Sequence, residues 1–483
     1  MKVLYCTSEA KPFASSGGLG DVAGSLPKAL QDSGVECRVV MPLYQDISPK
    51  LKKEFRYITN FRVSVGWRNQ YCGVFEYQHK GVTFYFLDNE YYFKRKGLYS
   101  FYDDGERFTF FSRAILEMLC HIEFAPDIIH ANDWQTALVP VYHNLYYRQM
   151  EKFMGIQTVF TIHNIQYQGK YGMEILEDTC GIGVKYANIL EYDGCANFMK
   201  GAIEMADWIS TVSPSYATEI LDPWFSHGLD RLLQAKKYKL CGILNGIDVE
   251  GYNPETDPNL TCNFNIETVQ EGKVACKKEL QEIFGLEQTN LPLMAMVTRL
   301  VAHKGLDLVK AVAESILEQG IQLIILGTGE YGYESFFIEL AAKYPDQCGV
   351  KIDFVPSLAS KIYAGADLFL MPSKSEPCGL SQMISVRYGT IPIVRETGGL
   401  KDSILDSGNG EGNGFTFANY NAHDMLHTCW RAKEGYANKE GWYKLVRRAM
   451  QCDFSWKASA KKHIEMYESV KEVCAGTWIA FED

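Results

Sequence analysis

Short apolar runs alternate with amphipathic segments of helix length along most of the chain. Several runs are hydrophobic throughout, which is typical of strands covered on both faces of a parallel sheet. In the first half we predict strands at residues 2–6, 37–41, 83–87, 127–130, 158–163, 209–212 and 242–244. In the second half we predict strands at 293–297, 322–326, 351–355, 368–371 and 392–394, with helices at 306–318, 338–343 and 380–388.

This alternation predicts an α/β fold with two doubly wound, Rossmann-like domains. A chain of 483 residues is also too long for a single hydrophobic core. The turn-rich stretch 247–260 and the charged helix predicted at 268–284 mark the break, so we expect domains at 1–246 and 247–456. Ligands of wound sheets bind at the carboxyl ends of the strands. Two such domains facing each other would close a central cleft on a shared substrate.

Composition and charge narrow the class of protein. The chain is 47% hydrophobic and 22% charged, as in globular proteins, and its net charge of −11 argues against nucleic acid or an anionic membrane as a partner. No apolar stretch approaches the length needed to span a bilayer, and no signal peptide is recognisable. The 14 cysteines include no Cys-x-x-Cys pair. They indicate reduced thiols, and therefore a cytoplasmic location.

The segment from Ser373 to Gln382 carries the strongest chemical signal. Glu376 stands just before a Pro and a Gly that open a predicted helix, and a second Gly pair follows the next strand, at Gly398 and Gly399. A carboxylate can accept hydrogen bonds from ribose hydroxyls, and helix N-termini offer free N–H groups to a diphosphate. The arrangement therefore suits a nucleotide-diphosphate sugar. An ordinary loop with a solvated glutamate is the alternative.

Two cations follow the first predicted strand of the second half. Arg299 can grip a phosphate with two hydrogen bonds, whereas Lys304 acts as a compact point charge. Gly327, in a Gly-Thr-Gly turn after the next strand, permits close approach of a ligand to the backbone. Solvated surface cations are the alternative, but the same strand edge carries the Glu376 loop, which makes coincidence less plausible.

The first half has its own candidates at strand ends. Gly17 and Gly18 would let an anion approach the start of a helix, in which Pro27 should cause a kink or a restart. Asp133 and His163 each follow a predicted strand and are polar groups at the mouth of the sheet, although loop caps are the alternative. Aromatic residues in the polar loop 91–104 could stack on sugar rings or fill the core, among them Tyr91, Tyr92 and Tyr99.

Other catalytic patterns are missing from the sequence. His423 and His427 have the spacing of a metal pair but lack both the glutamate of H-E-x-x-H and an obvious third ligand, so we expect no metal. Neither a nucleophile elbow nor a P-loop occurs.

Taken together, the motifs resemble bacterial glycogen synthases and plant starch synthases, which are retaining glucosyltransferases of the GT-B fold. The resemblance runs from end to end. It is carried by Ser16-Gly-Gly-Leu-Gly-Asp-Val22, His130–Trp134, Thr161–Asn164, Asn245–Asp248, Arg299 with Lys304, Glu376-Pro-Cys-Gly-Leu380, Thr397-Gly-Gly-Leu400 and Asp453–Trp456. In this fold the last helix returns to the first domain, so 457–483 would pack there.

The resemblance implies transfer of glucose from ADP-glucose, rather than UDP-glucose, to the non-reducing end of an α-1,4-glucan, with retention and without a metal or other cofactor. The catalytic residues would be Glu376, Arg299, Lys304, His163 and Asp133. The donor would contact Ser15, Gly17, Gly18, Gly327, Cys378, Gly379, Leu380, Thr397, Gly398 and Gly399. The acceptor would contact Glu9, Asp21, Asn164, Tyr91, Tyr92 and Tyr99. Cys378 has no nucleophilic role in this scheme.

One position departs from the family pattern. The family usually has a lysine where this chain has Ser15, so a phosphate-contacting cation is missing from the first domain. Either Lys11 or the backbone replaces it, or nucleotide affinity and rate are lower. Two other functions are therefore considered: another GT-B enzyme with a different nucleotide sugar, and a glucan-binding protein with weakened catalysis.

Overall fold

The computed structural model describes residues 1–479, with side chains described as far as Val473. The chain divides into two compact units. Unit 1 comprises Met1–Val212, Ala217–Gly246 and the C-terminal segment from Trp456, and unit 2 comprises Ser213–Tyr216 and Ile247–Ser455. The sequence predicted domain boundaries between residues 246 and 247 and between 456 and 457, and the structure places them at 246/247 and 455/456. Residues 480–483 of the predicted C-terminal segment lie outside the described residues.

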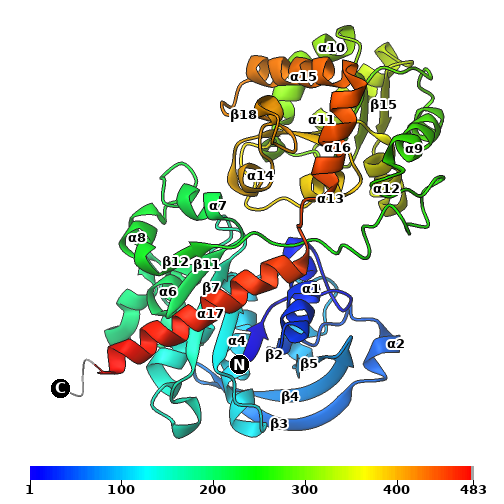
Figure 1. Cartoon of the computed structure of the whole chain (residues 1–483). Coiled ribbons are helices and arrows are strands. Elements are labelled where there is room, and N and C mark those ends of the chain that lie inside the picture. The colour runs from blue at the N-terminus through cyan, green and yellow to red at the C-terminus, as the bar shows by residue number, and fades with distance from the viewer. Residues whose placement is uncertain (480–483) are drawn as a thin grey trace. The chain divides into compact units, whose positions relative to one another are not determined.

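A sheet of nine strands forms the centre of unit 1 (Figure 1). Seven of them run parallel, in the order β12-β11-β7-β6-β1-β2-β5, and β4 and β3 continue the sheet as an antiparallel hairpin. The strands are β1 (Lys2–Cys6), β2 (Glu36–Pro42), β3 (Arg56–Val65), β4 (Arg68–His79), β5 (Val82–Asp88), β6 (Ile128–Asn132), β7 (Gln157–Ile162), β11 (Trp208–Thr211) and β12 (Leu240–Gly242). A small separate sheet holds β8 (Lys170–Tyr171), β9 (Glu191–Tyr192) and β10 (Cys195–Asn197).

Unit 2 contains a six-stranded parallel sheet in the order β15-β14-β13-β16-β17-β18. Counted within the unit, this is the order 3-2-1-4-5-6 of a doubly wound sheet. The strands are β13 (Leu293–Val297), β14 (Gln322–Leu326), β15 (Cys348–Lys351), β16 (Leu368–Met371), β17 (Ile391–Arg395) and β18 (Phe415–Phe417).

Helices connect the parallel strands in both units. Those of unit 1 are α1 (Gly18–Asp32), α2 (Pro49–Lys52), α3 (Glu90–Phe93), α4 (Asp104–His121), α5 (Leu138–Tyr142), α6 (Phe198–Met205), α8 (Asp230–Ala235) and α17 (Trp456–Ile479), while α7 (Pro214–Glu219) is shared between the units. Those of unit 2 are α9 (Val269–Phe284), α10 (Leu306–Glu318), α11 (Tyr331–Lys343), α12 (Pro356–Gly365), α13 (Ser381–Arg387), α14 (Gly398–Ser403), α15 (Ala422–Ala437) and α16 (Lys439–Met450).

The order of the strands defines one switch point in the large sheet of each unit. In unit 2 the chain leaves β13 toward β14 on one side and later returns to β16 on the other. In unit 1, β2 and β6 flank β1 in the same way. At such a point the loops after the two neighbouring strands diverge and leave room for a ligand. The loops after β1, β6, β13 and β16 are therefore the places to look for function.

The structure differs from the sequence prediction in several elements. The strand predicted at 351–355 lies at Cys348–Lys351, and the apolar residues that follow it form a loop in which Phe354 is 83% exposed. Helix α1 continues through Pro27, so the helix does not restart there, and the other possibility, a kink at Pro27, stays a prediction. The alternation of strands and helices did not predict the hairpin β3–β4, because a tight turn rather than a helix joins its two strands.

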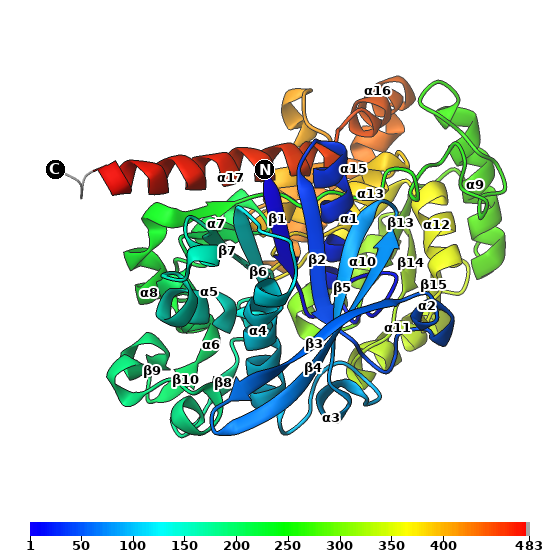
Figure 2. The ribbon, with the colours of Figure 1, turned by 90° about the horizontal axis from the view of Figure 1, so that it is seen from below.

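Helix α17 packs against α1 within unit 1 (Figures 1 and 2). Its buried side chains include Met466, Tyr467 and Val470. The Tyr467 hydroxyl lies 2.7 Å from Nδ1 of His130 in β6, and Nε2 of the same ring lies 2.5 Å from the Thr161 hydroxyl in β7. The helix is thus bonded to the strands whose ends carry the candidate residues of unit 1.

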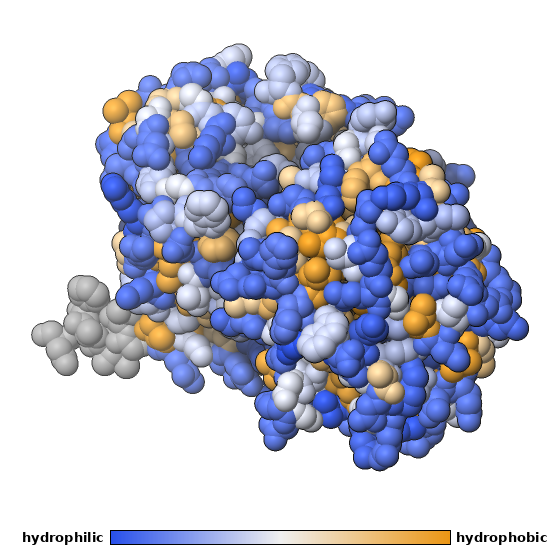
Figure 3. Space-filling view, turned by 90° about the horizontal axis from the view of Figure 1, so that it is seen from above, coloured by the Kyte–Doolittle hydropathy of each residue, from blue (hydrophilic) through white to orange (hydrophobic). Residues whose placement is uncertain are grey.

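Hydrophilic residues predominate on the face drawn in Figure 3, with hydrophobic residues in scattered groups. Among the described helices, none combines the length and the apolar character required to cross a bilayer.

Replacing Tyr467 with alanine should destabilise unit 1 by about 3–5 kcal/mol, because a buried aromatic ring and its hydrogen bond to His130 are removed together. Thermal unfolding followed by circular dichroism measures the effect. Lys461→Ala, at an exposed position of the same helix, is the control. An equal midpoint for the two variants would show that α17 contributes nothing to this core.

Candidate functional site

The switch point of unit 2 brings a lysine and a glutamate together. Lys304 lies in the loop after β13, and Glu376 lies in the loop after β16. The Lys304 Nζ donates to Oε2 of Glu376 at 2.6 Å, and the Ser373 hydroxyl donates to the same oxygen at 3.0 Å. Glu376 is only 8% exposed, and such a shielded pair attracts more strongly than one in water. The sequence had assigned both residues to one site without predicting that they would pair.

Backbone contacts tie these two loops to each other. The Lys374 N–H donates to the His303 carbonyl at 2.9 Å. Gly305 has a φ of +73°, and a Cβ there would lie 2.0 Å from the Pro372 carbonyl oxygen. Glycine is therefore required, because the left-handed backbone and the close approach both exclude a side chain. The pairing of Lys304 with Glu376 follows from this fixed separation of the loops.

The glycine pair after β17 holds the other side of the Glu376 loop. The Gly399 N–H donates to the Glu376 carbonyl at 3.1 Å. Gly398 has a φ of +45°, and a Cβ there would lie 2.1 Å from the same carbonyl oxygen. A Cβ at Gly399 would lie 2.0 Å from the Cys378 carbonyl oxygen. The pair packs against the backbone that presents the carboxylate, a reason for glycine that the sequence did not suggest.

Arg395, which the sequence analysis did not single out, supports the same loop. Arg395 is 9% exposed, and its guanidinium donates to the carbonyls of Ser373 and Lys374 at 2.8 and 2.6 Å. Its contacts with these backbone carbonyls leave no signal in the sequence beyond the position of an arginine at the end of a strand.

The remaining donor candidates of unit 2 surround this loop. Arg299 is exposed, and its guanidinium has no hydrogen-bonded partner in the described part of the chain. Gly327 packs against the backbone of Thr298. A Cβ at position 327 would lie 1.8 Å from the Thr298 carbonyl oxygen, so packing alone also requires glycine here. The others lie where α13 and α14 begin: buried Cys378, Gly379 with a φ of +71°, Leu380 next to the first residue of α13, and Thr397 in the extended residue before α14.

In unit 1, Asp133 sits in a strained turn directly after β6. Its φ of +56° and ψ of 179° are rarely adopted by residues other than glycine. The carboxylate accepts the N–H groups of His163 and Asn164, at 2.8 and 3.3 Å. Burial raises the pKa of Asp133 to about 7, against the opposing effect of these two donors. Asp133 and His163, expected at one sheet edge, are thus in direct contact.

The tautomer of His163 follows from its neighbour Asn132. The Asn132 amide nitrogen donates to the carbonyls of Cys6 and His130, at 2.9 and 3.2 Å. Its oxygen, 2.8 Å from Nε2 of His163, must therefore accept the ring proton. Burial lowers the pKa of His163 to about 3, so the ring is neutral and its Nδ1 is an acceptor. Asn132 belongs to the motif His130–Trp134, but the sequence alone did not suggest a role for it.

Glu9 organises the loop that precedes α1. Glu9 is buried, its burial raises the pKa of the carboxyl, and the carboxylate accepts the Ser16 N–H. The loop places exposed Gly17 next to Gly18, the first residue of α1. Exposed Ser15 donates to the Gly17 carbonyl at 3.3 Å. The glycines thus stand at a helix start, as predicted.

Lys11 does not stand free to replace the lysine that the family has at position 15. Its ammonium donates to the Asp21 carboxylate at 2.5 Å, and both side chains are substantially exposed. Asp21, assigned to the acceptor from the resemblance, is therefore engaged with a cation.

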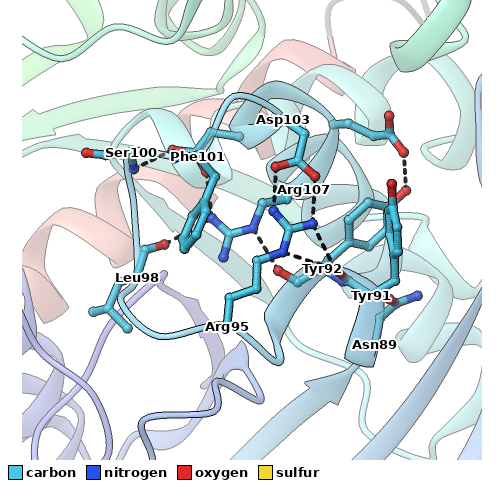
Figure 4. Close-up of polar contacts among 11 residues, drawn as sticks. Asn89, Tyr91, Tyr92, Arg95, Leu98, Ser100, Phe101, Asp103 and Arg107 are labelled. Atoms are coloured by element: carbon cyan, nitrogen blue, oxygen red, sulfur yellow. Dashed lines mark hydrogen bonds and ion pairs between the residues drawn. The ribbon is translucent and has the colours of Figure 1, made fainter.

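The predicted aromatic loop lies between β5 and α4, and its first residues belong to the short helix α3 (Figure 4). Tyr91 is 61% exposed, and the Tyr99 hydroxyl lies 2.7 Å from that of Ser8, after β1. Tyr92 is fully buried against Phe110, and its hydroxyl donates to Glu106. Tyr92 therefore has no ring face for a sugar, which corrects its assignment to the acceptor.

His423 and His427 lie on α15. Among the described residues, no group of three or more His, Cys, Asp and Glu side chains is arranged to hold a metal ion.

Replacing Gly398 with alanine should destabilise unit 2 by about 2–3 kcal/mol, because its left-handed backbone and its contact with Glu376 both disfavour a Cβ. Gly410→Ala is the matched control, since its φ of +84° is also left-handed but no atom lies within 4 Å of its Cβ position. Urea unfolding of both variants separates the two effects. Equal losses would mean that the contact with Glu376 imposes no constraint.

Comparison with known proteins agrees with this geometry. Residues 2–235 match the family model of the starch synthase catalytic domain, and 278–436 match that of glycosyl transferases group 1. The glycogen synthases of Geobacillus thermodenitrificans and Desulforamulus reducens are 52% and 48% identical, over 97% of this chain and 98% and 99% of theirs.

Solved structures give the same result. The catalytic domain of starch synthase IV from Arabidopsis thaliana, bound to ADP and acarbose, has a TM-score of 0.86 and 33% identity, covering 97% of this chain and 99% of that one. A sucrose-phosphate synthase from Thermosynechococcus elongatus shares the fold, with a TM-score of 0.59 and 17% identity over 98% and 99% of the two chains. The two doubly wound units are thus those of a GT-B glycosyltransferase, and the chain belongs to the glycogen synthase and starch synthase family.

Proposed function

We propose that this protein transfers glucose from ADP-glucose to the non-reducing end of an α-1,4-glucan, with retention of the anomeric configuration. The observation that carries the proposal is the Lys304–Glu376 pair at the switch point of unit 2, with Arg299 exposed on the same loop as Lys304. The names of its relatives, glycogen synthases and a starch synthase bound to ADP and acarbose, support a glucan acceptor and an adenosine diphosphate leaving group.

Unit 2 has the groups that a nucleotide sugar requires. Arg299 and Lys304 bind the diphosphate, and Glu376 accepts hydrogen bonds from hydroxyls of the ribose or of the glucose being transferred. In the free protein the Glu376 carboxylate partly neutralises Lys304. A diphosphate that draws the ammonium toward itself leaves the carboxylate available to sugar hydroxyls. Within unit 2, N–H groups at the starts of α13 and α14 add donors for the phosphates.

Unit 1 supplies the polar groups for the sugars. His163 is held neutral, and its free Nδ1 can accept a hydrogen bond from a glucose hydroxyl, consistent with a role near the 6-hydroxyl. Asp133 is fixed by two backbone donors and lines the acceptor side. Both groups are rigid before substrate arrives, so little ordering is needed on binding.

Retention fits a same-face attack better than a double displacement. A double displacement needs two carboxylates about 5 Å apart. Eight residues after Glu376, where the second acid of such a pair could stand, the chain has Ile384, which is buried on α13. The same-face route depends on stabilising the charge that develops on the departing diphosphate. Hydrogen bonds from two cations, about 1.5–3 kcal/mol each, would supply roughly two to four powers of ten in rate.

Ser15 bears on the strength of donor binding. With Lys11 paired to Asp21, unit 1 presents backbone N–H groups rather than a cation at the start of α1. We expect nucleotide affinity to rest mainly on unit 2.

A cytosolic location remains a prediction.

Incorporation of labelled glucose into glycogen, measured with ADP-glucose and UDP-glucose side by side, tests the proposal. ADP-glucose should be the better donor, and EDTA should leave the rate unchanged, because the residues assigned to the diphosphate are cations and N–H groups rather than metal ligands. A rate that EDTA abolishes and Mg²⁺ restores would contradict the metal-free reaction. No incorporation from either donor would contradict the function itself.

Replacing Lys304 with alanine should lower kcat by roughly 10- to 100-fold, because the change removes one charged hydrogen bond at the leaving group. The affinity for glucan, measured by gel electrophoresis in glycogen, should stay within about twofold. Lys310→Ala, on the following helix α10, is the control. Equal losses of turnover and glucan affinity would contradict the assignment of Lys304 to the leaving group.

A further inference from the structure

The side chain of Asn132, the last residue of β6, is fixed in one orientation. It is fully buried, and its amide nitrogen donates to the carbonyls of Cys6 and His130 at 2.9 and 3.2 Å. Carbonyls only accept hydrogen bonds, so the amide cannot be turned around. The backbone is fixed as well, because the Thr136 hydroxyl accepts the Asn132 N–H at 2.6 Å and donates to its carbonyl at 2.8 Å. The amide oxygen therefore has one possible direction.

That oxygen meets the ring of His163, which follows β7 directly. Nε2 of the ring lies 2.8 Å from the Asn132 oxygen, and the His163 backbone N–H donates to the Asp133 carboxylate at 2.8 Å. The side chain is only partly buried. Within the described part of the chain, no residue is hydrogen-bonded to Nδ1. The ring thus uses one nitrogen to bond the protein and leaves the other to a ligand.

The titratable groups around this ring are His130 on β6, His463 on α17 and Asp133. Burial lowers the pKa of His130 well below its ordinary value and that of His463 to about 4, so both are neutral at neutral pH. Asp133 bonds the backbone of His163, and its carboxylate also accepts the Asn164 N–H. Burial, with a smaller effect of His463, lowers the pKa of His163 to about 3. The neutral ring holds one proton, and Asn132 determines which nitrogen carries it.

A fixed proton gives the free nitrogen a fixed polarity. Because Nε2 carries the proton, Nδ1 has a lone pair and only accepts hydrogen bonds. A hydroxyl can donate to it. A fluorine or a carboxylate oxygen, which only accepts, would bring one lone pair against another. A ring without this constraint would serve either kind of group, since a neutral imidazole can carry its proton on either nitrogen.

We infer that Asn132 is a positioning residue that makes the site select a sugar by the direction of one hydrogen bond. The inference rests on the proposed function, in which His163 accepts a hydrogen bond from the 6-hydroxyl of the transferred glucose. Asn132 is buried and acts only through His163. A sugar whose position 6 cannot donate leaves Nδ1 without a partner, and a site built to bond a hydroxyl rejects such analogues.

Transfer to glycogen from three donors tests the inference in the wild-type protein. These are ADP-glucose, ADP-6-deoxyglucose and ADP-6-deoxy-6-fluoroglucose. Both analogues should lower kcat/KM roughly 10- to 100-fold, because neither offers a donor to Nδ1. The fluoro analogue should be no better than the deoxy analogue, although fluorine accepts hydrogen bonds. A fluoro analogue that is used better than the deoxy analogue would show that Nδ1 donates and would overturn the inference. So would analogues that are used as well as ADP-glucose.

Replacing Asn132 with alanine leaves the ring free to carry its proton on either nitrogen. The kcat/KM for ADP-glucose should fall roughly tenfold, and the preference for ADP-glucose over the fluoro analogue should shrink by a similar factor. In a His163→Ala background the same substitution should change kcat/KM by less than about twofold, because Asn132 acts through that ring. An unchanged preference, or an equal loss in both backgrounds, would mean that Asn132 only supports the fold.

Asn197→Ala is the matched control. Asn197 is also a fully buried asparagine of unit 1, but it bonds the Gln168 side chain at 2.7 Å and the Lys200 N–H at 3.0 Å. Its loss should lower stability and leave the preference between the three donors as in the wild type. A preference that shrinks equally in Asn197→Ala would contradict a specific role for Asn132.

The proton on His163 can also be located without substrate, by nuclear magnetic resonance of protein labelled with nitrogen-15 histidine. The His163 signals are assigned by their loss in His163→Ala. Between about pH 6 and pH 8, Nε2 should be protonated and Nδ1 bare. A proton on Nδ1, or on both nitrogens, would overturn the inference. A wild type that transfers no glucose from any donor contradicts the proposed function instead, and the spectrum still decides the role of Asn132, even if Asn132→Ala does not fold.

Discussion

The shielded ion pair between Lys304 and Glu376 is the interaction around which unit 2 is organised. The two residues come from loops on either side of the switch point, and their 2.6 Å contact requires those loops to keep a fixed separation. Gly305, Gly398 and Gly399 and the buried guanidinium of Arg395 maintain that separation through the backbone. Removing one member of a buried pair leaves an uncompensated charge, at a cost of about 3–5 kcal/mol for a fully buried one. A substrate that brings its own negative charge can replace Glu376 as the partner of Lys304 without that cost.

Unit 1 also has its candidate residues in loops at the switch point of its sheet, but different interactions hold them in place. Its switch point presents a carboxyl group with a raised pKa and a histidine with a lowered one, and both are held by backbone or amide partners rather than by opposite charges. Asp133 keeps an unfavourable backbone conformation because the Thr161 carbonyl accepts its N–H and its own carboxylate accepts two more. Strain of this kind persists only where the surroundings determine it, and it is frequent at functional sites. Unit 2 thus suits a charged donor, and unit 1 suits neutral sugars.

The sequence predicted the features that depend on local pattern. The structure has strands with the predicted bounds at 2–6, 293–297, 322–326 and 368–371. Continuous apolar runs of this length are typical of strands buried on both faces of a sheet. The main site residues followed from their place after such strands. What could not be predicted depends on packing between distant segments. The burial of Tyr92, the amide of Asn132 that orients His163, and the brace of Arg395 each require knowing which loops meet. The hairpin β3–β4 was missed for a different, local reason, since a tight turn rather than a helix joins its strands.

We propose above that the cations after β13 absorb the charge of the departing diphosphate. A crystal structure of the protein with bound ADP tests it most directly. We expect the guanidinium of Arg299 and the ammonium of Lys304 both to lie within hydrogen-bonding distance of phosphoryl oxygens. This proposal would be contradicted if Lys304 remained bonded only to Glu376 and Arg299 pointed into solvent while other groups held the phosphates.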